Sequence, residues 1–593
     1  MEIENYRQFT DEVINFDKDL TILAGANNSG KTSIVELFKI VFQKKSFSVD
    51  DISASKYPEL QKKFIDEINT IREECSTKLE FREKIKNKYS GLKDESLTII
   101  KINIEVEYDQ DERIFAFSDY LMELDESCKS FYFSYRFEVN ANELRNSLSE
   151  VSDEFFPGEA QDSKNESNNY GEVLKKIFEN SLINKIYFTD KDYQNKQEMS
   201  GESFQKLFNM NSVKATRLLD DEKEDRHFSI SKELLRHFTA SEGWEEFREA
   251  IIADIKERLD SRRLNEQIKV HSLDNVQKIL NDIENHFDYN KGEFILQTDI
   301  SDDHLMNFLS STLQTVFEFK DDVRLKEFSQ GLGITNLIFI CLKVESFIKH
   351  CHPDTVNLFI IEEPEAHMHP QMERMLIGFI KEILKTEGVK IQGVVTTHSS
   401  VIVKCSDLNN IRVLRIKGDL KSSVHDMHLF KQSLSNEEER RFFSFLFTIN
   451  YSDLVFANKI VMYEGDTEKL FIEKLLTDPQ FQKLANQYIA FVQVGGAYAH
   501  WYRKLIHFLN IKTVIITDMD YTKKLVDIDE IKKDTGITNA GLIEYYRDNV
   551  TQDLIRETII PYCEEKCDSQ LEDCFFTKDT FDQIELIRSD LRE

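Results

Sequence analysis

The chain has 593 residues, of which 76 are basic and 107 acidic, so its formal net charge is −31. This length exceeds one hydrophobic core, and two or three domains are expected. No apolar run approaches the ~18 residues of a membrane span, and the N-terminus lacks the basic-then-apolar pattern of a secretory signal, which predicts a cytoplasmic protein that does not enter a membrane.

The first motif is a glycine-rich segment near the start that fits the phosphate-binding P-loop pattern in full. Leu20–Ala24 before it is typical of a short buried strand, and Ser33–Phe42 after it is typical of an apolar helix. The unpaired N–H groups and the dipole of a helix N-terminus both favour phosphate. The pattern predicts ATP binding by Gly25, Asn27, Asn28, Ser29, Gly30, Lys31 and Thr32, with Lys31 on the outer phosphates and the Thr32 hydroxyl on Mg²⁺.

A second acidic strand is needed to hold Mg²⁺ and to polarise water. Leu358–Ile361 supplies four apolar residues, and Glu362 and Glu363 follow at its carboxyl end. We expect Glu362 to hold Mg²⁺ through water and Glu363 to act on the attacking water. Aspartate is usual at the first position, and the extra methylene of Glu362 could move the metal and slow hydrolysis.

These motifs resemble those of ABC-type ATPases of the SMC, RecF and RecN kind. The resemblance is carried, in the order of that family, by the opening strand Ile3–Phe9, the variant signature loop Phe328–Gly333, the segment Pro364–Pro370 and the switch segment Thr397–Ser399. It implies that heads dimerise, so that Ser329 and Gly331 of one head contact the nucleotide of the other, with a helix over residues 331–342. His398 follows the apolar strand Gly393–Thr396 and is expected to be the switch histidine. By itself it could also be a structural residue.

The second group of motifs lies near the end of the chain. Three apolar strands are predicted, and they alternate with helices at residues 469–476 and 500–509; the strands are Lys459–Glu464, Tyr488–Val494 and Thr513–Thr517. Such a pattern predicts a parallel sheet, whose carboxyl edge carries the ligands. Glu464, Asp518 and Asp520 would meet there and make an all-oxygen site suited to Mg²⁺ or Mn²⁺.

This arrangement resembles the Toprim domain, and an ABC head followed by Toprim resembles the OLD (overcoming lysogenization defect) family. Within that family the chain resembles the class of the Gabija nuclease subunit and the retron-associated OLD-type effectors. The resemblance implies an α/β protein that cleaves DNA with two divalent metals held by Glu464, Glu468, Asp518 and Asp520, as an anti-phage defence effector. It also implies homo-oligomers, dimeric or tetrameric, and a neighbouring-gene partner such as a helicase or a reverse transcriptase with its RNA/DNA product.

One departure from the pattern of that family leaves alternatives open. The family usually adds a late Ser-x-Glu-like element and a basic residue, for which Lys566, Glu572 and Asp573 are only candidates, so a one-metal nicking enzyme is one alternative. Another is an ATP-binding sensor or scaffold whose Toprim domain binds a partner or DNA without efficient cleavage. A Toprim primase or topoisomerase is disfavoured, because neither a zinc ribbon nor an active-site tyrosine context is apparent.

The organisation expected from these motifs is an ATPase head interrupted by a helical insertion and followed by Toprim. The boundaries are 1–145 and 301–450 for the two parts of the head, 146–300 for an insertion that dimerises, and 451–593 for Toprim. Within these segments we expect an amphipathic antiparallel strand at residues 96–106, an exposed loop at 147–171 and helices at 222–287.

Overall fold

The computed structural model describes residues 1–43, 45–88, 98–109, 112–122, 129–151, 166–214, 229–239, 241, 243–261, 303–304, 307–309, 316–318, 324–326, 331–384, 390–418, 420–449, 451–495, 499–516, 574–578 and 584–588. The chain divides into two compact units. The first comprises residues 1–212, 351–362 and 381–593, and the second comprises residues 213–350 and 363–380.

A six-stranded, mainly parallel sheet carries the P-loop strand at an interior position. Its order is β14-β13-β3-β12-β11-β8, in which only β14 is known to be antiparallel to its neighbour. The strands are β3 (Leu20–Gly25), β8 (Phe208–Lys214), β11 (Val356–Glu362), β12 (Ile391–Thr397), β13 (Ile411–Ile416) and β14 (Ser422–Asp426). The strands predicted at 20–24, 358–361 and 393–396 are confirmed, because continuous apolar runs mark strands that are covered on both faces.

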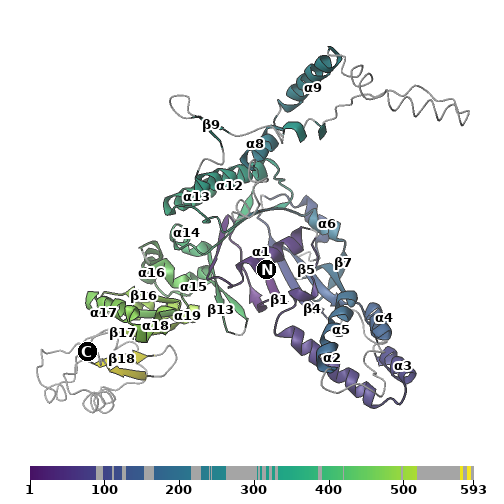
Figure 1. Cartoon of the computed structure of the whole chain (residues 1–593), viewed down its shortest axis with the longest axis horizontal. Coiled ribbons are helices and arrows are strands. Elements are labelled where there is room, and N and C mark those ends of the chain that lie inside the picture. Colours follow the sequence, from purple (N-terminus) through teal and green to yellow (C-terminus); the bar gives the residue numbers. More distant parts are fainter. Residues whose placement is uncertain are drawn as a thin grey trace, which may run out of the picture. The chain divides into compact units, whose positions relative to one another are not determined.

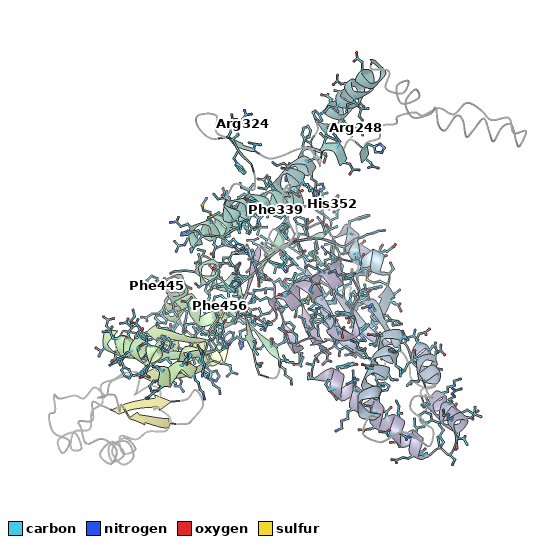
Figure 2. The ribbon with its side chains drawn as sticks, viewed as in Figure 1. Arg248, Arg324, Phe339, His352, Phe445 and Phe456 are labelled. Atoms are coloured by element: carbon cyan, nitrogen blue, oxygen red, sulfur yellow. The ribbon has the colours of Figure 1, made fainter. Side chains whose placement is uncertain are left out.

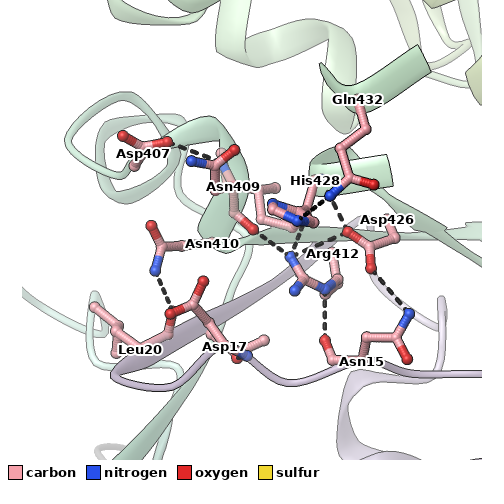
Figure 3. A network of polar contacts seen from close by, with 12 residues as sticks. Asn15, Asp17, Leu20, Asp407, Asn409, Asn410, Arg412, Asp426, His428 and Gln432 are labelled. Carbon is pink, nitrogen blue, oxygen red and sulfur yellow. Dashed lines mark hydrogen bonds and ion pairs between the residues drawn. The ribbon is translucent and has the colours of Figure 1, made fainter. Parts of the chain in front are cut away.

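Arg412 on β13 holds that strand beside the segment that leads into β3 (Figure 3). Its guanidinium pairs with Asp426 at 3.2 Å and donates to the carbonyl of Asn15 at 2.6 Å. Asn15 in turn donates to Asp426 at 3.3 Å. Burial lowers the pKa of Arg412, and Asp426 opposes that change. A buried charge of this kind requires its partners, so the network fixes the register of β13 on β3.

A second, antiparallel sheet has the order β2-β1-β4-β5-β6-β7 (Figure 1). Its strands are β1 (Glu2–Tyr6), β2 (Phe9–Val13), β4 (Thr98–Glu107), β5 (Ser130–Val139), β6 (Leu182–Thr189) and β7 (Lys196–Met199). The predicted antiparallel strand at 96–106 is confirmed from Thr98 onward. The predicted opening strand Ile3–Phe9 is wrong in extent, because Arg7 has a φ of 47° and turns the chain into a β1–β2 hairpin.

The core of the first unit is rich in phenylalanine. Phe42 from helix α1 (Lys31–Phe42) packs on Phe208 with ring centroids 4.6 Å apart, and Phe204 lies 4.9 Å from Phe208. Phe133 of β5 joins the same cluster, 5.4 Å from Phe204. Aromatic rings from α1 and from the antiparallel sheet therefore meet in one core, which keeps the P-loop helix in place.

Helices cover residues that were expected to be a loop. The first unit contains α2 (Lys56–Glu73), α3 (Lys78–Lys88), α4 (Ala141–Val151), α5 (Glu166–Ser181) and α6 (Gly201–Gln205). The loop predicted at 147–171 is therefore wrong at both ends, and residues 152–165 lie outside the described residues. Leu144 and Leu148 on α4, and Leu174 and Phe178 on α5, are fully buried at helical spacing, which outweighs the polar composition between them.

The second unit is mostly helical. It contains α8 (Ser229–Thr239), α9 (Trp244–Ser261), α12 (Leu332–Lys349), most of α13 (Pro370–Ile383), and a hairpin of β9 (Val316–Glu318) and β10 (Arg324–Lys326). Figure 2 labels Arg248 on α9, Phe339 on α12 and Arg324 on β10. The helices predicted at 222–287 are confirmed where α8 and α9 lie; the remainder lies outside the described residues.

The C-terminal part of the first unit contains a three-stranded parallel sheet with the order β16-β15-β17. Its elements are β15 (Lys459–Tyr463), α17 (Asp466–Thr477), α18 (Gln482–Ala485), β16 (Ile489–Gln493), α19 (Arg503–Leu509) and β17 (Lys512–Ile516). It is preceded by α14 (Ser400–Lys404), α15 (Met427–Ser433) and α16 (Glu437–Ile449), and followed by the antiparallel pair β18 (Cys574–Lys578) and β19 (Ile584–Arg588). The predicted parallel sheet is confirmed. No helix in the described parts of the chain is long and apolar enough to cross a membrane.

Candidate nucleotide site and Toprim site

Three strands of the parallel sheet bring their carboxyl ends to one edge. Thr397, the last residue of β12, pairs with Ala24 of β3, and Glu362, the last residue of β11, pairs with Thr396. The start of the P-loop, the end of β11 at Glu362 and the end of β12 just before His398 therefore lie next to one another at this edge of the sheet. Ligands of open parallel sheets bind at such an edge.

At two positions of the P-loop, only glycine fits the backbone and its surroundings. Gly30 precedes α1 with a φ of 106°, and a β-carbon there would collide with the Gln8 amide and the Phe9 ring. A β-carbon on Gly25 would lie 2.6 Å from the carbonyl oxygen of Leu414. Both glycines thus let the loop curl tightly onto its surroundings, which is the shape that a phosphate cradle needs.

The polar groups of the loop fit an anionic ligand. Lys31 is 4% exposed, and its ammonium donates to the carbonyls of Gly25 at 2.7 Å and Ala26 at 3.0 Å. Ser29 is 1% exposed, and its hydroxyl is among the buried polar atoms of the described residues that have no hydrogen-bond partner. Asn27, Asn28 and Thr32 are exposed. A buried cation and an unsatisfied hydroxyl at a helix N-terminus match what phosphate oxygens would accept.

The hairpin turn of the antiparallel sheet supports this loop. The Gln8 side chain donates to the carbonyl of Asn28 at 3.3 Å, while the Gln8 carbonyl accepts from the Ser422 amide at 2.9 Å. Asn28 itself has a φ of 63°. Sequence reasoning missed Gln8, because nothing in the motif marks a residue twenty positions upstream.

Glu362 is paired with a lysine from the P-loop helix. The carboxylate is 5% exposed, and its Oε1 accepts from Lys39 Nζ at 2.8 Å. Lys39 also pairs with Glu36 at 2.9 Å, and Glu36 pairs with Lys45 at 3.2 Å. Burial lowers the pKa of Lys39, but the hydrogen bonds to Glu362 and Glu36 together outweigh burial and leave that pKa raised. Sequence reasoning missed Lys39, although it is one of the few charged residues on an otherwise apolar helix.

Glu363 and His398 occupy constrained backbone positions. Glu363 is half-buried with a φ of 45°, a left-handed conformation that is uncommon for glutamate. His398 is exposed, between Thr397, whose hydroxyl accepts from the Ser399 amide at 2.9 Å, and Ser399, whose hydroxyl caps α14 through the Val401 amide at 3.1 Å. These bonds fix the backbone that carries His398.

Within the second unit, helix α12, which the signature loop leads into, packs closely on the segment after Glu363. The predicted helix at 331–342 is confirmed as α12, which begins at Leu332 and extends to Lys349, with Gly331 exposed at its N-cap. A β-carbon on Gly333 would lie 2.6 Å from the His367 carbonyl, and Asn336 donates to the Ala366 carbonyl at 3.3 Å. Ser329 lies outside the described residues.

At the Toprim site, strand register decides which groups meet. Tyr463, the last residue of β15, pairs with Gln493 of β16 and with Ile516, the last residue of β17. Half-buried Glu464 therefore leaves the sheet beside the point where β17 ends. Asp518 and Asp520 follow β17 within four residues and lie outside the described residues, as does any site that they form. Among the residues that the structure does describe, no group of three or more His, Cys, Asp or Glu side chains could hold a metal.

Glu468 and Asp466 are engaged in local hydrogen bonds. Glu468 Oε2 accepts from the Gly465 amide at 3.0 Å, closing the first turn of α17. Asp466 Oδ1 accepts from the Gln493 side chain at 3.2 Å. Two basic side chains of this part of the chain are also partnered: Lys504 with Glu439 at 2.6 Å, and Lys459, at the opposite end of β15 from Glu464, with Gln487 at 2.6 Å.

Side chains of the first unit join the P-loop sheet to the Toprim sheet. Phe508 on α19 packs on Phe430 of α15, with centroids 5.1 Å apart, and on His425 of β14 at 5.7 Å. Burial, followed by the charges of Arg415 and Lys417, lowers the pKa of His425 to about 4. The imidazole Nε2 lies 3.0 Å from the Ser423 hydroxyl. This histidine is therefore neutral at physiological pH.

Models of two known families match the region of the nucleotide site and the region of the Toprim site. The model of the AAA ATPase domain matches residues 1–403, and that of the TOPRIM domain of overcoming lysogenization defect-like proteins matches residues 455–520. The endonuclease GajA of Bacillus cereus is 25% identical over 551 residues, which are 88% of this chain and 73% of that protein. The OLD nuclease of Thermus scotoductus is 25% identical over 178 residues, which are 30% of this chain and 33% of that protein.

Solved structures add distant likenesses. The SMC head domain from Thermotoga maritima aligns over 72% of this chain and 97% of that chain at 11% identity, with a TM-score of 0.31. A score at this level is too low to establish a shared fold.

Proposed function

Because the chain belongs to the AAA ATPase domain family and to the OLD family of ATPase–Toprim nucleases, we propose that it is a nucleotide-regulated DNA endonuclease that depends on Mg²⁺ or Mn²⁺. The observation that carries the proposal is the register of β15 on β17, which sets Glu464 at the edge from which Asp518 and Asp520 follow. Carboxylates gathered at one sheet edge suit hard divalent cations.

In the head, the residues of the P-loop bind ATP. Lys31 exchanges its two carbonyl partners for the outer phosphates, and the Ser29 hydroxyl gains the acceptor that it lacks. Thr32 and Glu362 hold Mg²⁺, which neutralises phosphate charge. Glu363 takes the proton of the attacking water, and His398 responds to the nucleotide state.

The signature residues act between heads. Ser329 and Gly331 of one head contact the nucleotide of a second head, so that ATP favours a homodimer or a tetramer built from dimers. Gly331 supports this proposal through its exposed position at the N-terminus of α12, where backbone N–H groups face an anion favourably.

In the Toprim domain, Glu464, Asp518 and Asp520 hold the divalent metal, with Glu468 as a further ligand. The metal supplies Lewis-acid activation of the phosphodiester and neutralises the leaving oxygen. Lys469 and Arg503, which lie in the first turns of the helices that follow β15 and β16, meet the DNA backbone, so binding should weaken steeply with salt. Glu468 serves this role only if the oxygen that caps α17 is shared or released.

The test of the nuclease is cleavage of plasmid DNA with Mg²⁺ or Mn²⁺. Wild-type protein should cut, and EDTA, Glu464→Gln and Asp518→Asn should each abolish cutting while nucleotide binding persists. Lys31→Ala should lose nucleotide binding but retain a folded Toprim domain. Undiminished cutting by Glu464→Gln and Asp518→Asn would refute the metal assignment.

A second candidate is an ATP-binding sensor or scaffold that holds DNA or a partner without efficient cleavage. The ion pair between Lys39 and Glu362 favours it, because an acid already engaged by an ammonium is poorly free to serve in hydrolysis. The same plasmid assay separates the two, since a scaffold would bind DNA and ATP but leave the DNA intact.

The remaining assignments extend the same proposal. The head comprises residues 1–145 and 301–450 together with strands β6, β7 and β8, the rest of residues 146–300 is a dimerising insertion, and Toprim spans 451–593. The protein acts in the cytoplasm as an anti-phage effector, with a neighbouring-gene helicase or reverse transcriptase as its partner. Co-purification with the product of the adjacent gene tests the last point.

A further inference from the structure

We propose that Lys39 is a positioning residue that competes with Mg²⁺ for Glu362, so that this head binds nucleotide with little help from the metal. The inference rests on the proposed nucleotide site and concerns a residue outside the P-loop motif. Lys39 lies eight positions after Lys31, and 323 residues separate it from Glu362.

The geometry gives Lys39 a defined place. Its ammonium lies between Glu362 at 2.8 Å and Glu36 at 2.9 Å, and its side chain is 14% exposed. Helix α1 is anchored by buried residues on its apolar face, so Lys39 reaches the carboxylate from a fixed support. An ammonium that is largely covered and lies between two carboxylates is held by charge-assisted hydrogen bonds, and the Glu362 side of this pair is the more buried, because the Glu36 side chain is 30% exposed and that of Glu362 only 7%.

This pairing alters what Glu362 can offer. Oε1 is engaged by Lys39, so a cation that approaches Glu362 must use the other oxygen or displace the ammonium. An approaching Mg²⁺ also meets the positive charge of Lys39 beside the buried Glu362, where repulsion between the two cations is stronger than in bulk water. Lys39 therefore partly neutralises the negative charge of Glu362 before Mg²⁺ binds.

Lys45 provides the matched control. It pairs with Glu36 at 3.2 Å, so it belongs to the same chain of ion pairs, but its side chain is 53% exposed and Glu362 is not its partner. Loss of Lys45 removes one positive charge from the network while the bond between Lys39 and Glu362 stays in place. Exposed ion pairs of this kind contribute little.

The experiment measures binding of a fluorescent, non-hydrolysable ATP analogue to the full chain, in EDTA and across a Mg²⁺ titration. Measured relative to each protein's own affinity in EDTA, Lys39→Met should increase the gain in affinity on adding Mg²⁺, on the order of tenfold, because Glu362 becomes an unpaired acid. Lys45→Met should match the wild type. In a Glu362→Gln background, Lys39→Met should change nothing further.

Lys39→Gln, which keeps a hydrogen-bond donor without the charge, replaces Lys39→Met if thermal melting finds the latter unfolded. An identical Mg²⁺ response in the wild type and in the folded Lys39 variant overturns the inference and leaves the proposed function standing. A wild-type chain that binds no nucleotide at all refutes the proposed function, and the inference with it.

Discussion

Arg415 of β13 donates a hydrogen bond of 2.9 Å to the carbonyl of Ala457, two residues before β15 begins. The residue before Arg415, Leu414, pairs with Gly25 at the start of the P-loop. Burial lowers the pKa of Arg415 to about 10, so the guanidinium stays charged at neutral pH. One side chain thus joins the strand beside the nucleotide loop to the sheet that carries Glu464.

Replacing Arg415 with Met should lower the free energy of unfolding by about 1–3 kcal/mol, because the Ala457 carbonyl would lose its donor. Urea unfolding followed by circular dichroism measures the change. Arg441→Met is the control, since Arg441 is 81% exposed and pairs only with nearby Glu437 among the contacts that the structure describes. Equal midpoints for the Arg415 variant and the wild type would contradict the prediction.

Gly30→Ala should abolish nucleotide binding and destabilise the head. A β-carbon at a φ of 106° is strained, and it would collide with the Gln8 amide and the Phe9 ring. Gly378→Ala on α13 is the comparison, because its β-carbon meets nothing within 4 Å and alanine favours a helix by roughly 0.5–1 kcal/mol. Nucleotide binding by the folded Gly30 variant at wild-type affinity would show that the loop tolerates a side chain.

The stability of the first unit should fall as the pH drops from about 6.5 to about 4. The pKa of His425 is lowered in the folded protein, whereas in the unfolded chain it is close to ~6.5, so in this window the unfolded chain binds the extra proton. Above the window this contribution is constant. His425→Gln should flatten the difference between melting temperatures at pH 7 and pH 5, and His352→Gln, which removes an exposed imidazole, should not.

Glu468 caps α17 and is also proposed as a metal ligand, and substitution can separate these two roles. Glu468→Gln keeps an oxygen that accepts from the Gly465 amide but loses the charge, whereas Glu468→Ala also loses the cap of α17, at a cost of about 1 kcal/mol. If Glu468 is a metal ligand, both variants should need more Mg²⁺ for plasmid cleavage, and only the alanine variant should melt earlier. A glutamine variant with the wild-type Mg²⁺ requirement would leave Glu468 with the capping role alone.

The strands that lead into the proposed nucleotide site and the proposed Toprim site could be predicted from the sequence. Each is a short apolar run that is followed directly by the turn in which the candidate residues lie. Leu20–Gly25 and Lys459–Tyr463 are both of this kind, and burial on the sheet makes their pattern continuous. The edge at which residues gather also follows from the parallel topology alone.

Two of the misses, Lys39 and helix α5, share a physical cause, which is contact across long stretches of chain. Lys39 and Glu362 are 323 residues apart, so no local pattern could indicate their pairing. The turn at Arg7 depends on backbone conformation that the alternating residues do not reveal, and the helix α5 owes its burial to partners elsewhere in the fold. The partners of Asp518 and Asp520 remain a prediction.

The hairpin residue Gln8 links the nucleotide loop to the antiparallel sheet. Its side chain donates to a carbonyl of the loop, and its main-chain carbonyl accepts from Ser422 on β14, an edge strand of the parallel sheet. A ligand that tightens the loop must therefore pull on both layers together, so the two sheets of the head should stiffen as one body rather than in sequence.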